Sequence, residues 1–142
     1  MYGNYGVDTM ENLADDTCRV LVVDDEIEIV ANIKAHLERC DYQVETAVTG
    51  LDALELLRSQ HYHVLLADIV MPDISGLGLI EIALREKPDL IIIAMTGYGQ
   101  QVKDLTHERS PHYYLEKPFS LNQLSDVIDS ALQKSRSPEA QR

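Results

Sequence analysis

The sequence is poor in basic residues. Twelve Lys and Arg residues stand against 24 Asp and Glu residues, and the formal net charge is −12. A protein that binds nucleic acid directly needs a basic face, so this balance argues against direct contact with nucleic acid. Part of the acidic excess lies in residues 1–17, which contain four acids and no Lys or Arg. Together with its Gly and Asn content, this predicts a flexible acidic N-terminal tail over 1–17.

Other absences narrow the class of protein further. No run approaches the roughly 18 consecutive apolar residues of a membrane span. The first residues lack the basic start and the apolar core of a signal peptide. The two cysteines, Cys18 and Cys40, have no neighbouring ligand at the spacing of a zinc site. No G-x-x-x-x-G-K-[ST] motif is present, which argues against a nucleotide-binding P-loop. These features predict a cytoplasmic protein without membrane contact.

The stretch RVLVVDDE, residues 19–26, places three carboxylates directly after an apolar run. Their mutual repulsion must be offset by solvent, by a helix terminus or by a cation. One interpretation is a helix start, with Asp25 as the N-cap and Glu28 as its partner in a capping box. A Walker B strand, whose acid holds the magnesium of a nucleotide, is disfavoured because the P-loop motif is missing. The other interpretation is a magnesium site whose remaining ligands lie elsewhere, since hard cations bind carboxylate oxygens. These eight residues alone leave both interpretations open.

Beyond the tail, short apolar runs alternate with helical patterns. Strands are predicted over 19–23, 42–48, 63–70, 89–96 and 112–118, and helices over 26–39, 50–59, 76–87 and 120–134, with Thr49 and Ser120 as N-caps. Such an alternation predicts a parallel sheet covered on both faces, a doubly wound three-layer α/β fold. We expect one domain over 18–134, followed by a polar C-terminal tail or the start of a linker over 135–142.

Polar residues stand where the predicted strands end. Asp24 and Asp25 follow the first strand. Asp68 lies at the end of the third strand, Thr96 at the end of the fourth and Lys117 at the end of the fifth. Ligands of doubly wound sheets bind at the carboxyl ends of the strands, so these side chains are expected to converge. Such a set suits magnesium and a phosphoryl group, with one carboxylate attacking phosphorus to form an acyl phosphate.

Four segments, VLVVDDE, LLADIVMPDISGLGLI, IIIAMTG and YYLEKPF, resemble in order and spacing the receiver domain of two-component response regulators. The resemblance covers about residues 18–134 and implies the flavodoxin-like (βα)5 fold, with a five-stranded parallel sheet of order 2-1-3-4-5. It implies that Asp68 accepts a phosphoryl group from a histidine kinase or a phosphotransfer protein. The implied Mg2+ ligands are Asp25, Asp68 and the backbone carbonyl of Val70, with Asp24 acting largely through a water.

The resemblance also implies how phosphorylation is read. Thr96 and Lys117 hold the phosphoryl group, and Tyr114 packs inward when Thr96 moves toward it. The altered surface would comprise a short or mobile helix near 99–108, the fifth strand and the last helix, and would control a protein effector or a homodimer. A receiver catalyses only its own phosphorylation and dephosphorylation, so we do not expect an enzyme with a separate substrate. A haloacid-type phosphatase needs D-x-D after its first strand, a motif that this chain lacks there.

Two further positions bear on the lifetime of the phosphorylated state. In the family, the side chains two residues after the acceptor and two after the threonine flank the path of the attacking water. Here they are Val70 and Tyr98, and neither orients a water as an acid or an amide would. The sequence therefore predicts slow loss of the phosphoryl group.

Overall fold

The computed structural model of the chain describes residues 17–71, 73, 76–97 and 112–136. In chain order the elements are β1 (Arg19–Val23), α2 (Ile27–Arg39), β2 (Gln43–Ala47), α3 (Gly50–Ser59), β3 (Val64–Asp68), α4 (Gly76–Glu86), β4 (Ile91–Thr96), β5 (Tyr113–Glu116) and α6 (Leu121–Arg136). The predicted tail over 1–16, Tyr98, the helix expected near 99–108 and residues 137–142 lie outside the described residues.

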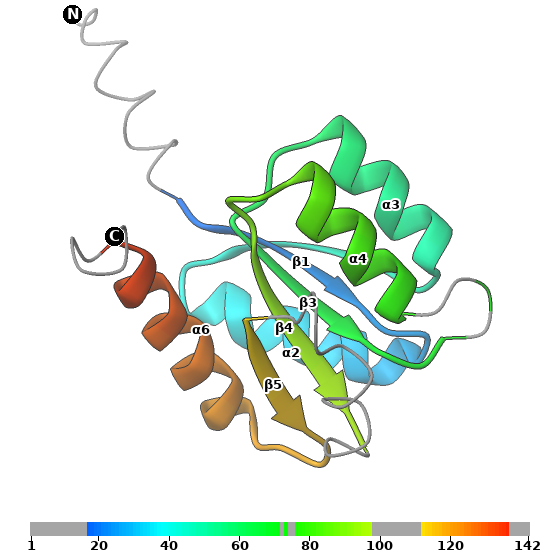
Figure 1. Cartoon of the computed structure of the whole chain (residues 1–142). Coiled ribbons are helices and arrows are strands. Elements are labelled where there is room, and N and C mark those ends of the chain that lie inside the picture. Colours follow the sequence, from blue (N-terminus) through cyan, green and yellow to red (C-terminus); the bar gives the residue numbers. More distant parts are fainter. Residues whose placement is uncertain (1–16, 72, 74–75, 98–111, 137–142) are drawn as a thin grey trace, which may run out of the picture.

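The five strands form one parallel sheet in the order β2-β1-β3-β4-β5, which confirms the predicted fold and topology (Figure 1). Every residue of β3 and β4 is buried, and so is every residue of β1 after Arg19. The edge strands are less buried: only Val44 and Ala47 in β2 and Leu115 in β5 are buried. The near-continuous apolar runs thus mark the centre of the sheet, as expected for strands covered on both faces.

Helices α3 and α4 cover one face of the sheet, and α2 and α6 cover the other (Figure 1). Side chains alternate between the faces along each strand. In β1, Leu21 and Val23 belong to the core beneath α3 and α4, whereas Val20 and Val22 belong to the core beneath α2 and α6. Within the described residues, none of the helices is long and apolar enough to cross a membrane.

The predicted helix starts had mixed outcomes. Thr49 caps α3 by accepting a hydrogen bond from the Asp52 amide at 3.1 Å, which confirms that prediction. Ser120 caps α6 by accepting from the Gln123 amide, and the Gln123 side chain accepts in return from the Ser120 amide. This is a reciprocal capping box. The last helix then continues to Arg136, two residues beyond the predicted end.

The first interpretation of the DDE run, a capping box of Asp25 and Glu28, does not hold in the structure. Helix α2 begins one residue later than that motif requires, with Glu26 as its N-cap and without a side-chain cap bond. The carboxylate of Asp24 instead accepts a hydrogen bond from the Glu26 amide at 3.0 Å. Asp25 lies in a cluster with Asp24 and Asp68, which places its carboxylate beside other acids rather than over the first turn of the helix.

Candidate functional site

The sheet register brings the predicted site residues to one edge. Val23 pairs with Ala67, so Asp24 and Asp68 both follow directly from this pair on adjacent strands. Thr96 is the last residue of β4, and the end of β4 pairs with the end of β5, where Lys117 follows. Because all five strands run parallel, their carboxyl ends converge here, as predicted from the sequence.

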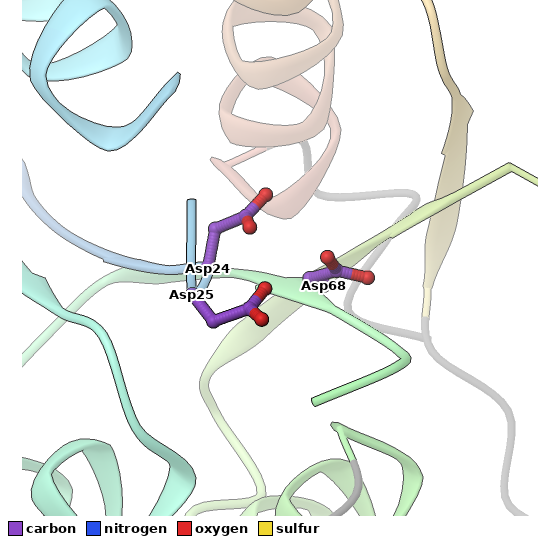
Figure 2. A group of neighbouring side chains, drawn as sticks. All are labelled: Asp24, Asp25 and Asp68. Carbon is purple, nitrogen blue, oxygen red and sulfur yellow. The ribbon is translucent and has the colours of Figure 1, made fainter. Parts of the chain in front are cut away.

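Asp24, Asp25 and Asp68 form an acidic cluster at this edge. One carboxylate oxygen from each residue lies within 4.8 Å of the others (Figure 2). Asp24 is fully buried, Asp68 is 8% exposed, and Asp25 faces solvent. Burial weakens the screening of like charges, so their repulsion calls for a nearby cation. A hard divalent cation such as Mg2+ fits this all-oxygen donor set.

The side chain of Lys117 supplies one positive charge to the cluster. Its ammonium donates hydrogen bonds to Asp24 Oδ2 at 2.8 Å and to Asp68 Oδ2 at 3.1 Å. A longer ion pair of 3.6 Å joins it to Glu26. Glu26 had no predicted role in the site, although it is the third acid of the DDE run that drew attention to this segment. One ammonium thus contacts three carboxylates, so most of their negative charge is still uncompensated and would attract a second cation.

The electrostatics of the cluster shift two pKa values. Burial raises the pKa of the Asp68 carboxyl, and the charge of Asp24 adds to this effect; hydrogen bonds from the Val70 amide and from Lys117 oppose it without cancelling it. For Lys117, burial acts to lower the pKa, but the hydrogen bonds and charges of Asp24 and Asp68 outweigh it, so the pKa is raised. The pocket therefore holds its lysine charged and resists a further uncompensated negative charge.

The segment that follows Asp68 is held close to the acceptor. The backbone amide of Val70 donates to Asp68 Oδ1 at 3.0 Å, while the Val70 side chain is largely exposed. Helix α4 begins against the same backbone, because the Gly76 amide donates to the carbonyl of Ile69 at 2.8 Å. A Cβ at Gly76 would lie only 1.9 Å from the carbonyl oxygen of Asp68. Only glycine permits this approach.

Thr96 and Tyr114 lie on neighbouring strands of the same sheet edge. Thr96 is 3% exposed, and its carbonyl accepts a hydrogen bond from the Lys117 amide at 2.7 Å. Tyr114 pairs with Ala94, two residues before Thr96, and its half-buried side chain packs against the core beneath α3 and α4. Since residues two apart share a face of a strand, Thr96 and Tyr114 face the same layer.

The fold and this cluster define a doubly wound α/β domain with a buried acidic site at the carboxyl edge of its sheet. The family model of the response regulator receiver domain matches residues 20–129, and the chain belongs to this family. It is therefore a signalling domain of the two-component type, which confirms the resemblance noted in the sequence.

Relatives found by sequence and by structure support membership of this family. A probable transcriptional regulator ycf27 of Cyanophora paradoxa is 34% identical over 121 residues, covering 84% of this chain and 50% of that protein. A CheY-like receiver domain protein from Methanospirillum hungatei JF-1 has a TM-score of 0.80 and 29% identity, over 84% of this chain and 97% of that one. The response regulator TrrA from Thermotoga maritima, solved in complex with Mg(2+)-BeF, has a TM-score of 0.75 and 33% identity, over 81% and 99% of the respective chains.

These names limit one expectation. The chain spans about half the length of the ycf27 relatives, and they are named as transcriptional regulators. The acidic composition argues against nucleic-acid contact by the receiver domain itself. That argument concerns the receiver domain alone, and the names of these relatives associate their whole chains with transcription.

Proposed function

We propose that this receiver domain is a phosphorylation-dependent switch in which Asp68 accepts a phosphoryl group from a histidine kinase or a phosphotransfer protein. The observation that carries the proposal is the cluster of Asp24, Asp25 and Asp68 within 4.8 Å, with Lys117 bonded to two of its members. A structural salt-bridge network would need only as many acids as its lysine can neutralise. Three clustered acids and one lysine leave an excess of negative charge at the sheet edge.

In this proposal Mg2+ would be held by Asp25, Asp68 and the carbonyl of Val70, with Asp24 acting through water. When bound, it would supply positive charge to the oxygens of the incoming phosphoryl group. The remaining groups of the proposed site are side chains of the protein. Asp24 is buried and already bonded to Lys117 and to the Glu26 amide, which suits an indirect role.

Phosphoryl transfer would replace the phosphorus–nitrogen bond of a phosphohistidine with a bond from an Asp68 carboxylate oxygen to phosphorus. The leaving imidazole keeps the electron pair of the broken bond. Lys117, which bonds Asp68 Oδ2, would pass its hydrogen bond to a phosphoryl oxygen, and the hydroxyl of Thr96 would donate to another. The only reaction catalysed would be the formation and hydrolysis of this acyl phosphate on the domain itself.

The signal would leave through β5 and α6, together with the segment before β5. Movement of Thr96 toward the phosphoryl group would let Tyr114 pack further inward on the adjacent strand. The changed surface would control a protein effector or a second copy of the domain. In a regulator as long as the ycf27 relatives, the effector would be a domain attached to the same chain.

The test is covalent labelling with a small phosphodonor in the presence of Mg2+. We expect intact mass spectrometry to show one added phosphoryl group per chain, mapped to Asp68. Asp68→Asn is the matched control because it preserves the size of the side chain but removes the nucleophile. Equal labelling of the parent and of this variant would refute the assignment. Chelation of Mg2+ should also abolish labelling, since the uncompensated acids repel a phosphate dianion.

A further inference from the structure

The carboxylate of Asp73 links the segment after the acceptor to a different helix. Its Oδ1 accepts a hydrogen bond from the Gly50 amide at 3.0 Å, and its Oδ2 accepts from the Leu51 amide at 3.1 Å. Gly50 and Leu51 are the first two residues of α3, whereas Asp73 lies between β3 and α4. A carboxylate is well placed there because the helix N-terminus carries partial positive charge.

These two hydrogen bonds complete the capping of the first backbone amides of α3. The first backbone amides of a helix have no partner within the helix. Thr49 satisfies the Asp52 amide through its side chain and the Ala53 amide through its carbonyl. Asp73 satisfies the two amides that remain at Gly50 and Leu51. The helix therefore has two caps, one local and one supplied by the segment that follows the acceptor.

The same segment presents Val70 to the acceptor. The Val70 amide holds Asp68 Oδ1, and the Gly76 amide closes the segment onto the carbonyl of Ile69. Both bonds lie within residues 68–76. At its start the segment is also joined to β4, because the Ile69 amide donates to the carbonyl of Met95 at 3.1 Å. Beyond Val70, Asp73 connects the segment to the start of α3. Helix α3 is itself packed against the sheet through Ala53 and Leu57.

We propose that Asp73 is a positioning residue of the phosphoacceptor site: its bonds to α3 fix the segment that sets Val70 against Asp68. This rests on the function proposed above, in which the carbonyl of Val70 is a magnesium ligand. Groups that orient metal ligands without touching the metal commonly change metal affinity when they are removed. If Asp73 were only a helix cap, its loss would affect the stability of α3 and nothing else.

The test compares Mg2+ affinity with stability in the full chain. Titration of the 15N-labelled protein with Mg2+ gives the Kd from the Val70 and Asp25 amide signals, and urea denaturation is measured in parallel. We expect Asp73→Ala to raise the Kd for Mg2+ about tenfold, and to shift the Val70 amide signal before metal is added. Asp73→Asn keeps one acceptor oxygen and should fall between the parent and Asp73→Ala.

Two control variants separate positioning from capping and from charge. Thr49→Ala removes the local cap of α3, so it should lower the urea midpoint and leave the Kd for Mg2+ unchanged. Asp52→Asn removes one negative charge from the same helical turn and should also leave the Kd unchanged. An equal rise in Kd for Asp73→Ala and either control, or no rise for Asp73→Ala, would overturn the proposal.

If Asp73→Ala does not fold, Asp73→Asn is judged by the same comparison. The experiment distinguishes a failure of the proposed function from a failure of the role proposed for Asp73. A parent protein that binds neither Mg2+ nor beryllofluoride overturns the proposed function and the role of Asp73 with it. A parent that binds both, beside an Asp73→Ala variant of equal affinity, overturns only the role of Asp73.

Discussion

Lys117 and Asp24, 93 residues apart in the chain, are joined by a hydrogen bond of 2.8 Å between the ammonium and Oδ2. The bond crosses from the residue after β5 to the residue after β1, above the end of β3, and the same ammonium reaches Asp68. It connects the edge strand β5 to the acids, which lie at the ends of the interior strands β1 and β3. The hydrogen bonds of Lys117 therefore also link the end of β5 to the ends of β1 and β3.

Removal of the lysine should destabilise the metal-free protein. In Lys117→Met, the buried Asp24 and the largely buried Asp68 lose their ammonium partner. We expect the free energy of unfolding to fall by roughly 3 kcal/mol, the lower end of the range for breaking a buried ion pair. Addition of Mg2+ should stabilise this variant more than the parent, because the metal then offsets a larger excess of negative charge.

Urea denaturation with and without Mg2+ measures both effects. Lys134→Met is the matched control, since Lys134 is an exposed lysine that lies over the ring of Tyr113 and far along α6 from the acids. It should change the free energy of unfolding little and leave the response to Mg2+ as in the parent. A Lys117→Met variant as stable as Lys134→Met would show that the acids are relieved in another way.

The close approach of α4 to the acceptor can be tested by adding a single methyl group. In Gly76→Ala, the new Cβ would lie 1.9 Å from the Asp68 carbonyl oxygen and 2.6 Å from Ile69 Cα, so the backbone must move. We expect a loss of about 1–3 kcal/mol, as for other overpacked sites, and weaker binding of beryllofluoride. Gly97→Ala is the control, because its Cβ would meet no atom of the described residues within 4 Å.

Comparison of the two alanine variants in urea separates crowding from the general effect of replacing glycine. The crowding explanation requires that only Gly76→Ala loses stability. Equal midpoints for the two variants would mean that the start of α4 moves away at little cost, and that Gly76 is not needed for the position of Asp68.

His112 makes the stability of the domain depend on pH. Its Nδ1 accepts a hydrogen bond from the Ile92 amide at 2.9 Å, which a doubly protonated ring cannot do, and burial lowers its pKa from 6.5. A histidine whose folded pKa is lowered binds fewer protons when folded. Its contribution to stability is therefore present above pH 6.5 and is lost as the pH falls from 6.5 through the lowered value.

The measurement is the urea midpoint at several values between pH 7.5 and 5, in buffers spanning about 2.5 units around the histidine pKa. On acidification the parent should lose more stability than the His112→Gln variant does. In that variant the side-chain oxygen of Gln can still accept the hydrogen bond from the Ile92 amide. NMR titration of the His112 ring should give a pKa below 6.5. Parallel pH profiles of the two proteins would contradict this prediction.

The sequence predicted the sheet and most of its helices because the signals there are periodic and local. The run LIIIAM at 90–95 is typical of a buried strand, and Thr49 and Ser120 are caps that act within three residues. The DDE run, whose two interpretations the local sequence left open, shows the limit of local patterns. A carboxylate before a helix can bond the helix or lie beside other groups, and here Asp25 lies beside Asp68, which is remote in the sequence.

The site was predictable as a set of residues but not as a set of bonds. Strand ends gave Asp24, Asp25, Asp68, Thr96 and Lys117, because a parallel sheet brings its carboxyl ends together. The capping of α3 by Asp73 could not be predicted, since it joins segments whose separation follows no period. The only sequence signal was an acid shortly after the acceptor, where many acids would simply face solvent.

The lifetime of the phosphorylated domain is the last prediction. The Val70 side chain, two residues after the acceptor, is 70% exposed and apolar, so it offers no hydrogen bond to the attacking water that the family resemblance implies at this position. Tyr98 lies outside the described residues and enters by its sequence position alone. We expect slow loss of the phosphoryl group in the parent and about tenfold faster loss in Val70→Asn with Tyr98→Glu, equivalent to ~1.4 kcal/mol off the barrier. Decay is followed by intact mass after removal of the phosphodonor. Val48→Asn, which introduces an amide at another exposed apolar position, serves as the control and should decay as the parent does. Decay in the double variant that is no faster than in Val48→Asn would show that access of water to Asp68 is limited elsewhere.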